Sequence, residues 1–341
     1  MEVQPKMHVI SYLYVINELH RVTMNRNMNA RNFGLRSSNM GRALITAYQL
    51  KSNGDNTKNQ CKTALNDFVR HLKEHGVNDL KKVERSDVLS YAQSLNERFE
   101  KGELSASSAQ NYLSKVNVAM ENARLDKACR VEGVKESGLP NRTGIASQDH
   151  SVTQEQHNQA LELLSPRLSA QLELQRTMGL RFKESSLIDA KGTLQHAKET
   201  GVIKIEFGTK GGRYREFNIN NQEQIRALER AAEIQGEHRS MIPNELSWKQ
   251  YQNQCNREIQ KSGIKFHGER HHYANQRYEA LTGVKSPVRA ELAHGSPHLN
   301  HLAQQRGITL TEAKQLDQSA RLQIAQELGH GRIGITNNYL G

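Results

Sequence analysis

Cysteine is scarce in this sequence, and long apolar runs are absent. Three cysteines lie far apart, with no CxxC pair: Cys61, Cys129 and Cys255. An odd, scattered set argues against a disulfide framework and against a cysteine zinc site. No apolar run approaches the roughly 20 residues that a membrane span needs. The nearest candidate, "VISYLYVI" at residues 9–16, is short for a signal peptide and lacks a small-residue cleavage site. We therefore expect a cytoplasmic protein with no membrane partner.

Acidic residues are outnumbered by basic ones. The chain has 47 Lys and Arg against 36 Asp and Glu, a formal net charge of +11 at pH 7. Such an excess favours a polyanionic partner, and nucleic acid is the first candidate. The same balance also fits a basic protein without such a partner, so charge alone leaves both possibilities open.

Regular patterning is missing from residues 1–40, whose Asn, Arg and Ser content predicts an extension or arm. Helical patterns begin after it. In the first clear helix one face is apolar, with Cys61, Leu65, Phe68 and Leu72. Similar faces follow in "ERSDVLSYAQSLNERF", with Ser86 and Asp87 as capping candidates, and in "SASSAQNYLSKVNVAMENAR". Residues 41–130 are therefore predicted to form a small all-helical domain.

Glycines and a proline gather at residues 131–150, where no periodicity is found, and this stretch is predicted to be an interdomain linker. The second domain, 151–341, opens at Thr153 with Gln156 placed for a capping box. Its clearest strand signal is "VIKIEFGTKGGRYREFNI", two alternating segments joined by a glycine-rich turn, which predicts a β-hairpin. The fold class is therefore mainly α, with a small β-sheet in the second domain.

Four short stretches of the second domain hold side chains suited to phosphate chemistry. The candidates are Arg181 with Glu184 in "TMGLRFKESSL", Lys210 at the hairpin tip, His267 with Arg270 in "HGERHHYA", and His330 with Tyr339 in "LGHGRIGITNNY". Taken singly, each has an ordinary explanation as a solvated surface residue or a packing residue. Their order and spacing carry the information.

That order resembles the tyrosine recombinases, the phage integrase family. "TMGLRFKESSL" is similar to the family's first box, with Gly-Leu-Arg and an acidic residue three positions after the arginine. "HGERHHYA" resembles the second box, and "LGHGRIGITNNY" matches Leu-Gly-His followed by tyrosine nine positions after the histidine. The resemblance covers roughly residues 41–341. It implies an N-terminal SAM-like core-binding domain followed by a mixed α/β, mostly helical catalytic domain.

The resemblance implies that Arg181 and Arg270 clamp the scissile phosphate. Two guanidinium groups can each make paired, charge-assisted hydrogen bonds to the phosphoryl oxygens, where negative charge accumulates in the transition state. His330 would donate a further hydrogen bond, and such preorganised donors are typically the largest catalytic contribution. Glu184 is expected to be an accessory residue.

The resemblance also assigns the covalent step. Tyr339 would attack the phosphorus and hold the DNA through a 3′-phosphotyrosyl bond, which conserves the bond energy. His267 would be the general base for a phenol whose ordinary pKa is near 10. Lys210, on the hairpin, would be the general acid that protonates the leaving 5′ oxygen. No metal or nucleotide cofactor is expected.

The sequence departs from the family pattern at three points. Glu269 stands where the family usually has leucine, next to a clamp arginine. The 60 residues from Arg270 to His330 exceed the expected spacing, which suggests an insertion at about 282–323, either neutral or used for specificity or subunit contacts. The sequence also ends two residues after Tyr339. Many relatives continue with a segment that docks on a neighbouring subunit, so the insertion is the first candidate for such contacts.

Three other functions fit part of the sequence. A zinc hydrolase could use a histidine group comprising His267, His271, His294, His298 and His301. However, H-G-E-R-H is not H-E-x-x-H, and this reading leaves Arg181, Lys210 and Tyr339 unexplained. A catalytically inactive DNA-binding relative would not need the full set of candidate residues. A type IB topoisomerase would share the chemistry without strand exchange.

The preferred hypothesis is a site-specific integrase of a phage or genomic island. Its partner would be double-stranded DNA at attachment sites, bound with an affinity that falls steeply as salt rises. The resemblance implies a homotetramer on DNA, because strand exchange needs two duplexes. Accessory DNA-bending or directionality factors are possible further partners.

Overall fold

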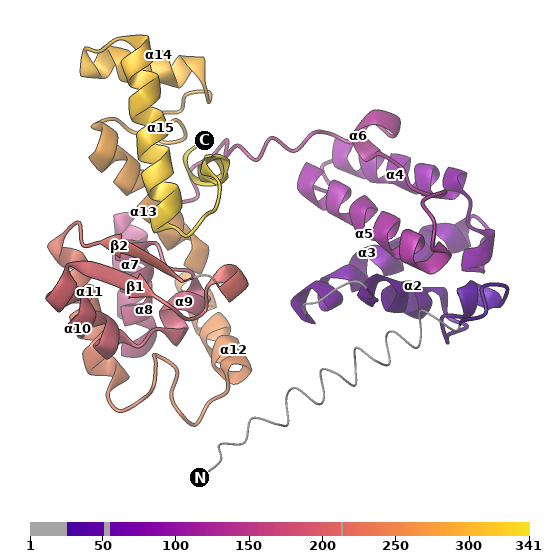
Figure 1. The fold of residues 1–341 in the computed structure, drawn as a ribbon, viewed down its shortest axis with the longest axis horizontal. Coiled ribbons are helices and arrows are strands. Elements are labelled where there is room, and N and C mark those ends of the chain that lie inside the picture. Colours follow the sequence, from indigo (N-terminus) through magenta and orange to yellow (C-terminus); the bar gives the residue numbers. More distant parts are fainter. Residues whose placement is uncertain (1–25, 51–54, 213) are drawn as a thin grey trace. The chain divides into compact units, whose positions relative to one another are not determined.

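The computed structural model describes residues 26–50, 55–212 and 214–341. Within it the chain divides into two compact units, Met1–Thr143 and Gly144–Gly341 (Figure 1). Most of the predicted arm, residues 1–25, lies outside the described residues. Across the described ranges, no helix is both long enough and apolar enough to cross a membrane.

The first unit is helical. Its elements are η1 (Arg31–Gly34), α2 (Met40–Gln49), α3 (Asp55–Glu74), η2 (Leu80–Lys82), α4 (Arg85–Glu100), α5 (Ala106–Arg124) and α6 (Gly133–Glu136). The apolar face predicted for α3 is fully buried in one core: Cys61, Leu65, Phe68 and Leu72. This core also takes Leu95 from α4 and Met120 from α5. The helical patterning predicted from the sequence is thus confirmed here.

The N-terminus of α4 differs from the sequence expectation. Ser86 and Asp87 were capping candidates, but the helix begins one residue before Ser86, and Glu84 is the N-cap. Asp87 occupies the third helical position, where its carboxylate accepts the Glu84 backbone N–H at 2.8 Å. An acidic side chain at that position stabilises the helix start from inside the first turn, so no cap at Ser86 is needed.

Two segments predicted to be irregular pack on the first core. Phe33 and Leu35, in the described part of residues 1–40, are buried against it. Val131 and Leu139, within 131–150, are also buried there, and α6 lies between them. Asn117 of α5 joins Val131 through a hydrogen bond in each direction. Scattered apolar residues without periodicity therefore complete the core of this unit.

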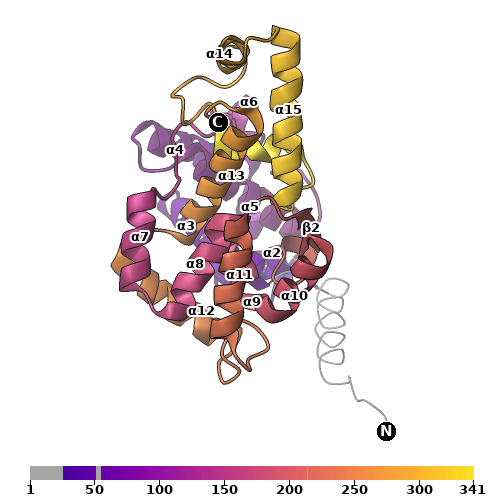
Figure 2. The ribbon, with the colours of Figure 1, turned by 90° about the vertical axis from the view of Figure 1, so that its left-hand side faces the viewer.

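The second unit is a helical assembly with one small sheet. Its helices are α7 (Gln154–Leu163), α8 (Pro166–Met178), α9 (Phe182–Leu187), α10 (Ala190–Thr200), α11 (Gln222–Gln235), α12 (Trp248–Ile259), α13 (Phe266–Thr282), α14 (Ser296–Arg306), α15 (Leu310–Glu327) and α16 (Asn337–Leu340). Short 3-10 turns are η3 (Lys210–Gly212), η4 (Gln260–Ser262) and η5 (Ile333–Thr336). Helix α8 packs against α11 and α13, as Figure 2 shows. The predicted fold class, mainly α with a small sheet, is confirmed.

The predicted hairpin and capping box are both present. Strands β1 (Val202–Ile205) and β2 (Arg215–Asn218) pair antiparallel, with Ile205 opposite Arg215. Alternate residues of each strand are buried, as a half-buried strand requires. At the start of α7, Thr153 Oγ1 accepts the Gln156 backbone N–H at 3.2 Å, and Gln156 Oε1 accepts the Thr153 backbone N–H at 3.0 Å.

Candidate active site

A tight corner between α8 and α9 positions Arg181. Helix α8 ends at Gly179, whose φ of +61° suits glycine. A Cβ at Gly179 would come within 2.6 Å of side-chain atoms of both Leu328 and Tyr273, so this corner also requires the absence of a side chain. Two residues later Arg181 is the N-cap of α9 in an extended conformation. Its side chain is 22% exposed and therefore reaches both solvent and the interior.

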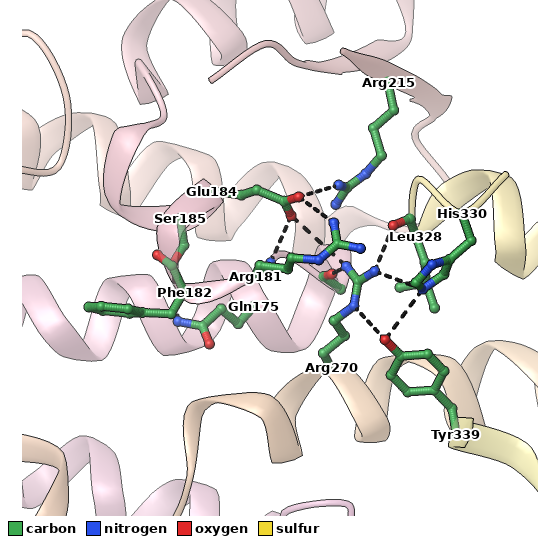
Figure 3. Close-up of polar contacts among 11 residues, drawn as sticks. Gln175, Arg181, Phe182, Glu184, Ser185, Arg215, Arg270, Leu328, His330 and Tyr339 are labelled. Atoms are coloured by element: carbon green, nitrogen blue, oxygen red, sulfur yellow. Dashed lines mark hydrogen bonds and ion pairs between the residues drawn. The ribbon is translucent and has the colours of Figure 1, made fainter. Parts of the chain in front are cut away.

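Glu184 is the buried anion of the site. Its Oε2 accepts the Arg181 backbone N–H at 2.8 Å, and its Oε1 accepts Arg181 Nη1 at 2.6 Å. Oε1 also accepts Nη1 of Arg215, from β2, at 2.8 Å (Figure 3). Burial raises the pKa of Glu184, but Arg215 and Arg181 outweigh it, so the net pKa lies below its ordinary value. The carboxylate is ionised and holds two guanidinium groups in place.

Sequence reasoning missed Arg215. A signal was available: in "YREFNI" Arg215 and Phe217 share one face of an alternating strand, and the structure buries both. A charged residue on the inward face of a strand needs a buried partner. Glu184, the acidic residue of the first motif, is that partner.

Arg270, from α13, is fully buried at the centre of the site. Its Nη1 donates to the Gly179 carbonyl, and its Nη2 donates to the Leu328 carbonyl at 2.6 Å. Its Nε donates to the Tyr339 hydroxyl at 3.1 Å, and Nη2 lies 3.2 Å from His330 Nε2. Burial, with a further contribution from nearby arginines, lowers the pKa of Arg270 to about 10, so it stays charged at neutral pH.

Tyr339 lies in α16 with its side chain 5% exposed. Its hydroxyl is 3.3 Å from His330 Nε2, so the two residues that stand nine apart in the sequence meet in space (Figure 3). The backbone is also anchored: Asn275 Nδ2 donates to the Tyr339 carbonyl at 3.2 Å, and the Val288 N–H donates to the Leu340 carbonyl at 2.9 Å.

Part of the predicted insertion, 282–323, therefore supports the tyrosine segment. Val288 makes the contact just described, and Arg321 of α15 donates to the Gly341 carbonyl at 3.1 Å. Leu302 and Ala313 form a small core between α14 and α15. These contacts give the segment a structural role beyond that of a neutral surface insertion.

His267 lies on α13, one turn before His271. The ring centroids of His267 and Tyr339 are 5.7 Å apart, and those of His271 and Tyr339 are 4.8 Å apart. Burial lowers the pKa of His267 to about 4, helped by Arg270 and Arg181. Burial lowers the pKa of His330 to about 3, again helped by arginines. Both imidazoles are therefore neutral at pH 7 and can accept a proton.

The predicted site residue Lys210, and Glu269, where the sequence departs from the family pattern, lie outside this group. Lys210 is exposed in η3, at the hairpin tip, and within the described chain no hydrogen bond or ion pair joins it to the other candidates. Glu269 is buried and turned away from the site. Its carboxylate accepts Arg176 Nη1 at 2.6 Å and contacts His157 Nδ1 at 2.8 Å. The acid beside Arg270 is thus already paired with Arg176 and His157, and the contacts of Arg270 do not involve it.

The histidines of the described residues do not assemble a metal site. Across residues 26–50, 55–212 and 214–341, no three His, Cys, Asp or Glu side chains are grouped so that they could hold a metal ion. His294 Nδ1 lies 2.9 Å from the Gly341 carbonyl, and His298 Nε2 lies 3.1 Å from the Lys285 carbonyl. These residues make backbone contacts instead, which argues against the zinc hydrolase alternative.

Comparison with known proteins adds to this geometry. Residues 141–276 match the family model described as Integrase. The XerH site-specific recombinase bound to a palindromic difH substrate has a TM-score of 0.51 and 16% identity, covering 88% of this chain and 80% of that chain. The Tn1549 transposon integrase in complex with a circular intermediate DNA has a TM-score of 0.50 and 14% identity, covering 87% and 94%. None of the curated protein sequences compared with this chain matches it. At these identities the structural likeness shows the fold, and together with the family match it confirms the resemblance seen in the motifs.

Proposed function

Because residues 141–276 match the integrase family and the chain has the fold of a tyrosine recombinase, we propose that it is a site-specific recombinase. It would cleave and rejoin double-stranded DNA through a 3′-phosphotyrosyl intermediate. One observation carries the proposal above all. A fully buried arginine, Arg270, contacts the hydroxyl of Tyr339 at 3.1 Å and the imidazole of His330 at 3.2 Å.

Arg181 and Arg270 are the proposed phosphate clamp. Both lie within 4 Å of Glu184, with Arg181 Nη1 at 2.6 Å and Arg270 Nη1 at 3.9 Å. The two guanidinium groups are therefore held in one small region by a common anion. A DNA phosphate entering there would receive donors already in position, which stabilises charge at no reorganisation cost in the transition state. His330 would add a third donor once the phosphate draws Arg270 away from Nε2, because a guanidinium can only donate to that nitrogen.

The proposed reaction is an in-line transesterification. The Tyr339 oxygen forms a bond to phosphorus while the bond from phosphorus to the 5′ oxygen breaks. The phenol proton would pass to the neutral imidazole of His267, which packs near Tyr339 with ring centroids 5.7 Å apart and has to come within hydrogen-bond distance in the DNA complex. Lys210 would donate a proton to the departing oxygen. The same groups act in reverse when a 5′ hydroxyl attacks the phosphotyrosine. No water or external energy source enters the cycle.

The exposed position of Lys210 suits the acid role in this proposal. A general acid on a turn can approach the leaving oxygen only when the hairpin meets DNA, and contacts of this kind often tighten only in the bound complex. The proposed substrates are attachment sites at the ends of a phage or genomic island. The proposed assembly is a homotetramer, with accessory DNA-bending or directionality factors as further partners.

A suicide substrate tests the function. The protein is incubated with nicked duplexes that span the ends of the DNA segment carrying its gene, and the mixture is analysed for covalent adducts that resist denaturing detergent. We expect an adduct with the wild type and none with Tyr339→Phe. Tyr251→Phe is the matched control, because Tyr251 is a buried tyrosine of α12 whose hydroxyl is hydrogen bonded to Gln171 and to none of the proposed catalytic residues.

The two variants separate the outcomes. An equal yield of adduct from Tyr339→Phe would contradict the assignment of the nucleophile. A wild type that relaxes supercoiled plasmid without preference for any site, and never exchanges strands, would favour a topoisomerase. Loss of adduct in Tyr251→Phe as well as in Tyr339→Phe would point to misfolding, which circular dichroism measures directly.

A further inference from the structure

Glu184 and the three arginines around it, Arg181, Arg215 and Arg270, form one cluster, and Arg215 is the member for which the sequence motifs predict no role. It is 7% exposed, and only one of its three guanidinium nitrogens is paired: Nη1 donates to Glu184 Oε1 at 2.8 Å. Its Nε and Nη2 are buried and have no hydrogen-bond partner among the described residues. Buried guanidinium donors without partners are costly, and proteins rarely retain them without a reason.

The unpaired nitrogens belong to a side chain that borders the histidine of the site. Arg215 lies against Gly329, the residue before His330. A Cβ at Gly329 would come within 2.9 Å of Arg215 Cδ and 3.3 Å of its Nη1. The glycine thus leaves the room that this side chain fills. Figure 3 shows the guanidinium groups of Arg215, Arg181 and Arg270 gathered around the carboxylate of Glu184, with His330 beside them.

The cluster carries an excess of positive charge. Three guanidinium groups share one carboxylate, so three positive charges against one negative leave an excess of two. Buried charge without compensation is strongly unfavourable. A phosphodiester brings one negative charge into such a site. The pentacoordinate transition state, with a second charge on its oxygens, matches the excess fully.

We propose that Arg215 is a third phosphate-binding arginine, whose Nε and Nη2 donate to a nonbridging oxygen of the scissile phosphate. This inference rests on the proposed recombinase function. Arg215 would contact the substrate directly while its Nη1 keeps Glu184 in place. The hairpin that carries the proposed acid Lys210 would then also carry a phosphate-binding residue. One β-hairpin would thus contact both a nonbridging oxygen, through Arg215, and the leaving 5′ oxygen, through Lys210.

The competing explanation is that Arg215 only holds Glu184 in place. A substrate without negative charge at the scissile linkage distinguishes this positioning role from direct phosphate binding. A methylphosphonate linkage replaces one nonbridging oxygen by a methyl group and is neutral. Losing an arginine that neutralises phosphate charge matters less on this neutral linkage. Losing an arginine that only positions Glu184 lowers the rate by the same factor on both linkages.

The experiment measures single-turnover adduct formation by Arg215→Gln and Arg215→Lys on the phosphodiester and methylphosphonate forms of the suicide duplex. We expect a loss of about a hundredfold for Arg215→Gln on the phosphodiester, the usual range for one lost oxyanion donor, and a loss below about tenfold on the methylphosphonate. Arg215→Lys keeps a cation next to Glu184 and therefore protects folding. Its loss of rate should likewise be smaller on the methylphosphonate than on the phosphodiester. Arg230→Gln, which removes a more exposed arginine of the same unit that pairs with Glu173, is the control and should react like the wild type on both linkages.

Equal losses on both linkages for the Arg215 variants would overturn the inference while leaving the recombinase function standing. If the wild type forms no adduct with either duplex, the proposed function fails, and anion binding still tests Arg215. Sulfate added to the DNA-free protein should raise the melting temperature of the wild type and of Arg230→Gln at similar concentrations. Arg215→Gln should need about tenfold more sulfate, as expected for one lost charge-assisted contact. An unchanged sulfate response would also overturn the inference.

Discussion

Arg270 donates a hydrogen bond from Nε to the hydroxyl of Tyr339 across 3.1 Å, although the two residues are 69 positions apart. The guanidinium is fully buried and is fixed by two backbone carbonyls on its other nitrogens. The proposed nucleophile is therefore held against the proposed phosphate clamp before DNA arrives. Such preorganisation removes part of the entropy cost of bringing the reacting groups together.

Lys210 offers a direct test of general acid catalysis. We expect Lys210→Ala to slow adduct formation by roughly 10²- to 10⁴-fold on ordinary DNA, the usual range for a lost general acid. Replacing the leaving 5′ oxygen by sulfur should restore most of the rate, because a thiolate leaves without being protonated. The measurement is single-turnover cleavage of the oxygen and sulfur duplexes side by side.

Lys191→Ala provides the matched control, since Lys191 is an exposed lysine of the same unit paired to Glu237. It should react like the wild type on both duplexes. An equal deficit of Lys210→Ala on oxygen and sulfur substrates would remove Lys210 from the acid role.

Glu269 is predicted to stabilise the fold by pairing with Arg176 and His157. Replacing it by leucine, the residue common in the family, leaves Arg176 buried without its anion. We expect a loss of about 3–5 kcal/mol in the free energy of unfolding, the usual cost of removing one partner of a buried ion pair. Urea unfolding followed by the fluorescence of Trp248, the only tryptophan of the chain, reports on this unit.

The double variant Glu269→Leu with Arg176→Met completes the cycle. It removes both charges and should recover most of the lost stability, because an apolar pair of similar volume often replaces a buried ion pair at little cost. A double variant as unstable as Glu269→Leu alone would show that the ion pair is not the cause.

Comparing alanine variants of Gly179 and Gly201 distinguishes the cost of backbone strain from the cost of steric crowding. Both have positive φ, +61° and +74°, but only Gly179 has neighbours where a Cβ would stand. We expect Gly201→Ala to cost about 1 kcal/mol, from the left-handed backbone alone. Gly179→Ala should cost about 1–3 kcal/mol more from overpacking against Leu328 and Tyr273.

Gly179→Ala should also impair chemistry, since the Gly179 carbonyl accepts a hydrogen bond from Arg270. Urea unfolding gives the stability, and the adduct rate of the folded fraction gives the catalytic effect. Similar stabilities and rates for the two alanine variants would contradict the crowding argument.

The buried histidines predict that the free energy of unfolding decreases as the pH is lowered below about 6.5. Burial, with the contribution of nearby charged groups, lowers the pKa of His267 and of His271 from 6.5 to about 4 in the folded protein. Between pH 6.5 and about 4 the unfolded chain binds protons that the folded protein does not, so acidification favours unfolding. After burial, Arg270 and Arg181 lower the pKa of His267. His267, His150 and Arg270 lower the pKa of His271, and Asp149 raises it.

Urea midpoints at pH 7.5, 6.0 and 5.0, read from Trp248 fluorescence, check this expectation. The midpoint should fall across the series in the wild type and fall less in His271→Gln. His196→Gln, which changes a half-buried histidine of α10, should keep the wild-type slope. A midpoint that stays constant from pH 7.5 to 5.0 would contradict the prediction.

Local patterns in the sequence were sufficient for much of the fold. The apolar face of α3, the capping box at Thr153 and the hairpin each depend on residues close together in the chain, and each is present. The motif spacing also singled out residues that the structure brings into contact, Arg181 with Glu184 and His330 with Tyr339. The start of α4 does not follow from local preference, because serine is a better N-cap than glutamate, yet Glu84 occupies that position and Asp87 stabilises the first turn.

What the sequence by itself determined was the set of chemical groups and their spacing, because helix faces, strand alternation and glycine turns follow from short-range geometry. Only the tertiary structure decided which groups share a partner. Arg215 meets Glu184 from 31 residues away, and Glu269 turns to Arg176 from 93 residues away. These pairings depend on which helices pack together, and the cost of an unpaired buried charge then selects each partner.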